Sequence, residues 1–209
     1  ILGALLVQGS LPMSNALDAR ALAQTFVDAH TANQFAPQPV DDATLHALYD
    51  LCKWGPTSMN CQPMRLVFVR SEVAKARLKP CLSPGNVDKT MAAPVTAIVA
   101  SDSSFFEHLP TQFPAFAGAR EMFAGNAALA AETALRNSSL QGAYLMVAAR
   151  MLGLAAGPMS GFDPARLNEA FFPEGRIRAN FLVNLGWPDA RGHRPRGPRL
   201  AFDDVARIE

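Results

Sequence analysis

Hydrophobic residues recur along this chain at two spacings, and segments of each spacing follow one another. Helical spacing with capping residues predicts helices over 16–32, 41–52, 71 to 78 or 81, 126–151, from 163 onward and near 205. Uninterrupted apolar runs predict buried strands over 66–69, 95–100 and 180–185, with a brief extended segment over 154–158. Turn formers predict a loop over 82–91. Residues 101–123 have no clear period and fit a short helix followed by an excursion over a pocket.

Two of the predicted helices carry apolar stripes. The stripe in 41–52 consists of Leu45, Leu48, Tyr49 and Cys52, at i, i+3, i+4 and i+7, and is expected to be buried. The stripe in 126–151 consists of Leu140, Tyr144, Val147 and Met151. Polar residues between 132 and 141 interrupt the first half of this second helix. We therefore expect the core of its own subunit to cover it only in part.

The order of these elements predicts the fold class. Helices separate the strands, but the connections are uneven and no regular β-α-β alternation runs the whole length, which favours α+β. A length of 209 residues suits one domain with a substantial core. Met13 precedes polar residues and resembles a natural start. We therefore assign 13–209 to a single domain and treat 1–12 as an extension outside the fold.

Composition and charge narrow the possible partners. Apolar residues make up 49% of the chain and charged residues 18%, and the formal net charge is +1. This balance gives no electrostatic reason to expect nucleic acid or an anionic membrane as a partner. No apolar run reaches the ~20 residues of a spanning helix. Three cysteines without C-x-x-C spacing argue against a disulfide framework and favour a reducing, cytoplasmic setting.

Familiar catalytic motifs are absent from the sequence. There is no G-x-G-x-x-G turn, no Walker lysine, no H-E-x-x-H and no nucleophile elbow. The four histidines show no metal-ligand spacing. An enzyme with these residues would need an organic cofactor to carry its chemistry.

One loop has the residues to hold such a cofactor. Gly55-Pro56 and Gln62-Pro63 bracket Thr57, Ser58 and Asn60, whose small polar side chains offer several hydrogen bonds. This composition suits a cradle for a flat, heteroatom-rich ligand. It also suits an ordinary connection between a helix and a strand, which is the commoner case for such a loop.

Several segments together resemble the flavin-dependent nitroreductase superfamily. They are 51–58 (LCKWGPTS), Gly85-Asn86 with Lys89-Thr90, 93–95 (APV), and 157–163 (GPMSGFD). The resemblance runs from about residue 22 to the C-terminus and is strongest to the branch described as malonic semialdehyde reductase. It implies an interwoven α+β homodimer, with a mixed or antiparallel sheet flanked by helices. FMN would lie in two clefts at the subunit interface.

The same resemblance assigns residues to the cofactor and leaves the chemistry to the flavin. Asn86 and Lys89 match positions at the pyrimidine edge, where an ammonium stabilises negative charge around N1 and O2 of the reduced ring. Ser160 and Gly161 match the turn whose backbone N–H faces N5. A further set matches a loop from the second subunit, namely Pro56, Thr57, Ser58 and Asn60. A solvated surface lysine and a plain capping turn are the alternative interpretations of Lys89 and Ser160.

The expected phosphate end departs from the family pattern. His30 and Thr31 stand where the family usually has arginine followed by a small hydroxyl residue. Histidine carries only part of a positive charge at neutral pH. Most of the neutralisation would then fall to Arg196 and to Arg199. We expect FMN retention to be weaker and more dependent on pH than is usual in the family.

The resemblance therefore implies an oxidoreductase that takes hydride from NADH or NADPH through FMN. The branch suggests reduction of 3-oxopropanoate to 3-hydroxypropanoate. A broad nitro- or quinone reductase is the alternative enzyme, and a non-catalytic flavin-binding dimer is the alternative outside catalysis.

Overall fold

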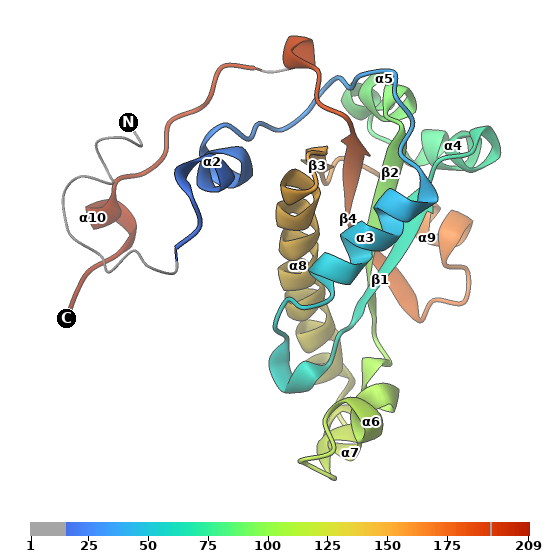
Figure 1. Cartoon of the computed structure of the whole chain (residues 1–209). Helices are drawn as coiled ribbons and strands as arrows, with labels where there is room; N and C mark the ends of the chain where they lie inside the picture. The colour runs from blue at the N-terminus through green and yellow to red at the C-terminus, as the bar shows by residue number, and fades with distance from the viewer. Residues whose placement is uncertain (1–15, 193) are drawn as a thin grey trace.

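Four strands form one antiparallel sheet at the centre of the chain (Figure 1). The computed structural model describes residues 16–192 and 194–209, so the predicted extension 1–12 lies outside the described residues. The strands are β1 (Met64–Val69), β2 (Val95–Asp102), β3 (Ala155–Met159) and β4 (Ile177–Gly186), in the order β1-β2-β4-β3. The predicted α+β class is confirmed, and the sheet is antiparallel rather than mixed.

Helices connect and cover these strands. Those before the third strand are α2 (Ala19–Leu22), α3 (Asp42–Cys52), α4 (Glu72–Leu78), α5 (Pro84–Ala92), α6 (Leu109–Gln112), α7 (Ala119–Ala124) and α8 (Ala127–Met151). The later ones are α9 (Pro164–Phe171) and α10 (Phe202–Val205). Shorter helical turns are η2 (Ala23–Val27), η3 (Ser58–Asn60), η4 (Lys79–Cys81), η5 (Phe105–His108) and η6 (Ala190–Gly192).

The sheet buries both of its faces, which explains the continuous apolar runs of β2 and β4. Helices α3 and α8 cover one face, and α4, α5 and α9 cover the other (Figure 1). The first core includes Leu48, Leu145, Val95, Val99 and Leu185. The second includes Leu78, Ile98, Leu167, Phe162 and Leu182. A third, smaller cluster under α6 and α7 includes Phe105, Leu109 and Phe123.

Side-chain caps fix where the predicted helices begin. Asp41 Oδ1 accepts from the Thr44 N–H at 2.8 Å, and Ser71 Oγ accepts from the Ala74 N–H at 3.2 Å. Asp163 Oδ1 accepts from two N–H groups of α9, which has Pro164 at its first position. The predicted helix starts at 41, 71 and 163 are confirmed, because the residue at each of these positions supplies an acceptor for an N-terminal N–H group that has no intrahelical partner.

Three sequence-based predictions need correction. The first helix ends at Val27 instead of running to residue 32, and its last five residues form a π-helical turn. The predicted loop 82–91 contains α5, because Pro84 occupies the first helical turn, where its missing N–H has no cost. Residues 101–123 form η5, α6 and α7 over the third apolar cluster.

The stripe on α8 lies on the outer side of this helix. Leu140, Tyr144 and Met151 are 48%, 43% and 51% exposed, and Tyr49 of α3 is 47% exposed against expectation. The side of α8 that faces the sheet carries small and polar residues, including Gly142, where an added Cβ would lie 2.4 Å from the Phe181 ring. Close approach of the helix and the sheet therefore favours small inward residues such as Gly142, with Leu145 as a large residue of α8 that is also buried.

An ion-pair cluster holds the end of β2. The Asp102 carboxylate is 1% exposed and contacts Arg65 Nη2 at 2.6 Å and Arg176 Nε at 2.8 Å. Burial opposes ionisation of this group. Hydrogen bonds from Arg176 and the Ser104 N–H, with the charges of both arginines, outweigh burial and lower the pKa of Asp102 below its ordinary value of 3.8.

Candidate functional site

A strongly basic cavity of about 420 Å³ lies between the segment after η2 and the C-terminal segment. We call it the arginine cavity; its lining includes His30, Thr31, Asn33, Arg150, Arg194, Arg196 and Arg199. The structure thus brings together four residues predicted for the phosphate end: His30, Thr31, Arg196 and Arg199. Arg196 Nη2 donates to the Val27 carbonyl and, at 2.9 Å, to the Ala29 carbonyl. These bonds fasten the C-terminal segment to the end of the first helix.

The segment around Thr31, which lines this cavity, is hydrogen-bonded to strand β3. The Ala32 N–H donates to the Ala156 carbonyl at 3.0 Å, and Thr31 forms a parallel bridge with Ala156. At the next residue the backbones come still closer, because a Cβ on Gly157 would lie 2.4 Å from the Ala32 carbonyl oxygen. Glycine is required for this approach.

A second cluster of predicted residues lies beyond the other end of β3. Asn86 Nδ2 donates to the Gly161 carbonyl at 2.8 Å, and the Ser83 N–H donates to the same oxygen at 3.1 Å. A Cβ on Gly161 would lie 2.4 Å from Asn86 Nδ2. Helix α5 therefore docks on the turn of Ser160 and Gly161, and Lys89 lies half-buried one turn further along it.

Sequence reasoning missed a series of hydrogen-bonded side chains that holds α5 in place. Thr96 Oγ1 donates to Asn184 Oδ1 at 2.8 Å, and Asn184 Nδ2 donates to Thr90 Oγ1 at 3.2 Å. All three side chains are fully buried, and Thr90 directly follows Lys89. An asparagine within the apolar run 180–185 was the available signal, because a buried amide needs partners.

The predicted loop 56–60 lies elsewhere in this chain. The Ser58 N–H donates to Asn137 Oδ1 at 2.8 Å, and Asn60 Nδ2 donates to the Gln112 carbonyl at 3.0 Å. The residues of α8 between Asn137 and Arg150 span about 20 Å at 1.5 Å per residue. Within one chain, Pro56, Thr57, Ser58 and Asn60 are therefore not brought to the arginine cavity.

This loop has a strained backbone. Two of its residues have positive φ, Met59 at 51° and Asn60 at 50°, and so does Gln62, two residues after it, at 40°. Such conformations cost about 1–3 kcal/mol each and persist where the surroundings impose them. The bonds to Asn137 and Gln112 hold the loop on both sides of Met59.

Two further features of the described residues are the buried thiols and the arrangement of possible metal ligands. Burial raises the pKa of Cys52 and of Cys61 to about 11, so neither is an ionised nucleophile at neutral pH. In the part of the chain that the structure describes, no cluster of three or more His, Cys, Asp or Glu side chains is arranged to hold a metal ion. No described helix is long and apolar enough to cross a membrane.

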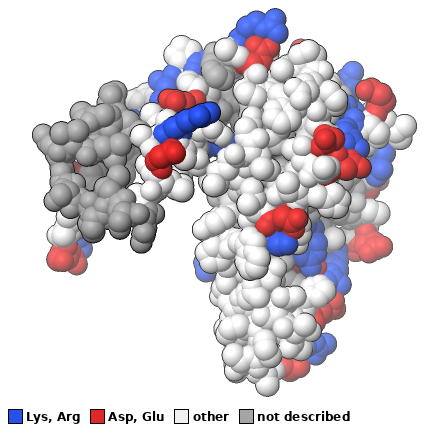
Figure 2. Space-filling view, viewed as in Figure 1, with Lys and Arg blue, Asp and Glu red and all other residues white. Residues whose placement is uncertain are grey.

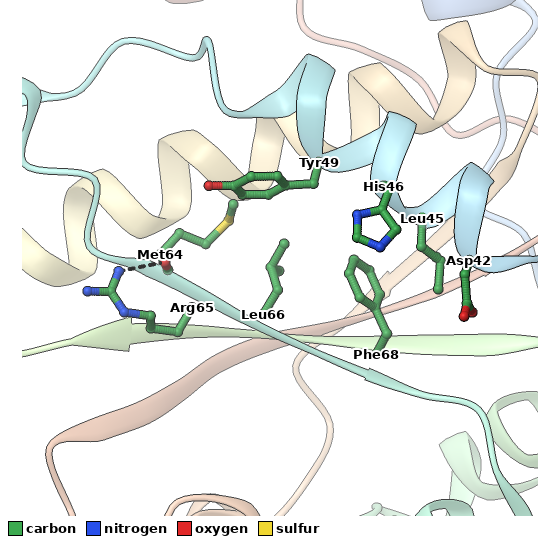
Figure 3. Close-up of a pocket in the computed structure, with 8 residues that line it drawn as sticks. All are labelled: Asp42, Leu45, His46, Tyr49, Met64, Arg65, Leu66 and Phe68. Carbon is green, nitrogen blue, oxygen red and sulfur yellow. Dashed lines mark hydrogen bonds between the residues drawn. The ribbon is translucent and has the colours of Figure 1, made fainter.

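A further cavity of about 460 Å³ lies between α3 and the edge strand β1 (Figure 3). His46 and Tyr49 of α3 face Leu66 and Phe68 of β1 across it (Figure 3). None of the residues predicted to bind the cofactor lines this cavity. It is a separate, largely apolar groove beside the open edge of the sheet.

Comparisons with known proteins show the family of this chain. The model of the family described as Nitroreductase family matches residues 28–187. A protein of Burkholderia lata with the provisional name NADH dehydrogenase/NAD(P)H nitroreductase is 63% identical over 189 residues, which cover 90% of this chain and 96% of that protein.

Solved structures share the fold. A provisional nitroreductase from Bacillus subtilis superposes with a TM-score of 0.83 at 17% identity, covering 92% of this chain and all of that one. Another from Exiguobacterium sibiricum, solved in complex with FMN, gives 0.78 at 20% identity, with coverage of 93% and 98%.

Proposed function

The chain belongs to the nitroreductase family, and we propose that it is an FMN-dependent NAD(P)H oxidoreductase. The observation that carries this proposal is the placement of two predicted clusters at opposite ends of β3. The basic cluster lies beside Ala156, and the Asn86–Gly161 pair lies five residues further on. Extended chain of that length spans about 16 Å. Such a separation suits a ligand with an anionic end and a flat polar end.

The residues present fit FMN at both ends. The arginine cavity offers guanidinium groups from separate segments, which suits the dianionic phosphate. His30, Thr31, Arg196 and Arg199 would hold that phosphate. At the other end, the absence of a side chain at Gly161 lets Asn86 lie against the turn, and Asn86 and Lys89 would hold the pyrimidine edge of the flavin beside Ser160. Bound FMN supplies two-electron chemistry, accepting hydride from NAD(P)H and passing it to the second substrate.

We further propose an interwoven homodimer with FMN at the interface. Large apolar side chains exposed on this chain support it, among them Trp54 at 78%, Leu140 at 48% and Tyr144 at 43%. The face of the molecule turned to the viewer in Figure 2 carries few charged side chains over α3 and α8. Leu200 and Ile208 of the C-terminal segment are 75% and 91% exposed. An isolated chain rarely leaves so much apolar surface uncovered.

The proposed dimer assigns a role to the loop 56–60. In one chain this loop is about 20 Å along α8 from the arginine cavity. In the homodimer, Pro56, Thr57, Ser58 and Asn60 would line the flavin site of the partner subunit. The strained backbone of the loop supports a binding role.

For the acceptor, we propose 3-oxopropanoate, reduced to 3-hydroxypropanoate. The resemblance of 157–163 to the malonic semialdehyde reductase branch supports this choice. A broad nitro- or quinone reductase is the second candidate, and the name of the Burkholderia lata relative supports it.

Colour, size and turnover test these proposals in one preparation. The purified protein is expected to be yellow and to release FMN on denaturation. Its molar mass from light scattering is expected to be that of a dimer. NADH and NADPH oxidation is then measured with 3-oxopropanoate and with a nitroaromatic at equal concentration. Faster turnover of 3-oxopropanoate supports the proposed acceptor, and faster turnover of the nitroaromatic supports the alternative. A protein that binds FMN but oxidises neither nucleotide is a non-catalytic flavin-binding dimer, and one that binds no FMN refutes the proposal.

A further inference from the structure

We propose that Arg150, in the last turn of α8, is a phosphate-binding residue of this site and supplies a permanent positive charge beside His30. The inference rests on the proposed function, since the phosphate is that of FMN. Neither the sequence motifs nor the family resemblance points to this residue.

The position of Arg150 places it at the junction of two cavities. It lines the arginine cavity and also a neighbouring cavity of about 480 Å³. Ala29 and His30, like Arg150, line both cavities. Arg150 therefore reaches the cluster of predicted phosphate residues from a different element, the long helix that packs on the sheet.

One hydrogen bond holds the Arg150 side chain and another holds its main chain. Its Nη1 donates to the Thr25 carbonyl at 3.2 Å, and Gln24 Nε2 donates to the Arg150 carbonyl at 2.7 Å. Both partners belong to the π-helical turn η2, so the turn and the end of α8 fix one another. The guanidinium is preorganised beside the cavity, which reduces the entropy cost of binding an anion.

The charge of Arg150 has little compensation nearby: among the described residues that line either cavity, Asp28 is the one acidic residue, and it lies in the neighbouring cavity. The Nε of Arg150 is buried and has no hydrogen-bond partner among the described residues. Arg65, Arg136 and Arg176 all contact carboxylates, whereas no ion pair of Arg150 occurs in the described part of the chain. Burial, and then the neighbouring charge of Arg196, lower the pKa of Arg150.

A bound dianion would resolve this unfavourable arrangement. A desolvated guanidinium beside a second one is costly without a counter-charge. Phosphate oxygens accept from several guanidinium groups at once, which a single carboxylate does less well. FMN phosphate and free inorganic phosphate share this chemistry, so the test must separate them.

The test compares FMN with riboflavin, which lacks the phosphate. Dissociation constants of both are measured by flavin fluorescence for the wild type, Arg150→Met, Arg150→Lys and the control Arg166→Met. Arg166 lies on α9, is 69% exposed and lines neither cavity, so its replacement removes the same charge elsewhere. Melting of the flavin-free proteins checks that each variant folds.

Loss of a charge-assisted bond is expected to raise the FMN dissociation constant of Arg150→Met on the order of 10- to 100-fold. The riboflavin constant should change little, Arg150→Lys should be intermediate, and Arg166→Met should match the wild type. An unchanged FMN constant overturns the inference. Equal weakening of FMN and riboflavin also overturns it, because Arg150 would then act only through the shape of the site.

The inference and the proposed function fail in different ways. A wild type that binds neither flavin overturns the proposed function and the flavin role of Arg150 with it. Melting in inorganic phosphate then decides the anion-binding role alone. A rise in Tm for the wild type but not for Arg150→Met supports that role, and equal responses overturn it.

Discussion

Gly157→Ala tests whether β3 holds the phosphate end in place. An added Cβ would lie 2.4 Å from the Ala32 carbonyl oxygen, whereas ordinary contact begins near 3.4 Å. The segment or the strand must therefore move by about 1 Å (3.4 − 2.4). The obstructing atom belongs to the backbone, so no change of rotamer relieves the clash.

The size of the effect follows from this geometry. Overpacking of this kind costs about 1–3 kcal/mol. About 1 kcal/mol of that is the net value of the 3.0 Å bond from the Ala32 N–H to the Ala156 carbonyl, which the displacement breaks. For a domain of this size the Tm should fall by about 2–12 °C.

Gly85→Ala provides the matched control. No atom lies within 4 Å of a Cβ added at Gly85, which stands in the first turn of α5. The control should melt at or slightly above the wild-type temperature, because alanine favours a helix by up to about 1 kcal/mol over glycine. All proteins are compared at one concentration, since a dimer melts in a concentration-dependent way.

Flavin binding supplies the second readout. In Gly157→Ala, residues 30–33, which run beside β3, should be displaced. The dissociation constant for FMN should therefore rise more than the dissociation constant for riboflavin. The reasoning is refuted if Gly157→Ala and Gly85→Ala melt together and bind FMN equally well.

Two further predictions concern charge. His30→Arg should tighten FMN binding, because the planar guanidinium can donate two parallel hydrogen bonds to a phosphate; equal dissociation constants for both proteins would contradict this. Asp102→Asn should lower stability at neutral pH by about 1–3 kcal/mol, because Arg65 loses its carboxylate partner and Arg176 keeps only Glu107. The pKa of Asp102 lies below its ordinary 3.8 in the folded protein, so its stabilisation is complete above that value and is lost as pH falls through the folded pKa. Urea unfolding from pH 7 to pH 3 should therefore show a steeper acid loss for the wild type than for the variant.

The sequence predicted the sheet well because its strands are long apolar runs. Val95 to Ala100 is buried on both faces, and few other structures accommodate such a run. The N-termini of helices were predicted where an acidic or hydroxyl side chain caps them. Helix α5 was missed because Pro84, Gly85 and Asn86 favour a turn locally, while their packing against the 160–161 turn selects a helix.

The candidate site was predictable only where a motif repeats a family pattern. His30, Arg196 and Arg199 were named on that basis, and the structure brings them to one cavity. Arg150 had no such signal, since an arginine in the last turn of a helix ordinarily indicates a favourable interaction with the helix dipole. Its significance depends on segments more than 40 residues away in sequence, which spacing alone cannot place together.

The length of β3 has a consequence for how this protein can diverge. One residue inserted into the strand would lengthen it by about 3.3 Å and turn its following side chains to the opposite face. Ala156 is fully buried in the core, so such a change would also exchange interior for surface. Point substitutions at either end can alter which chemical groups are recognised. The distance between the two ends is fixed by the sheet. Proteins that evolve from this chain can therefore change the chemical groups of the proposed ligand more easily than its length.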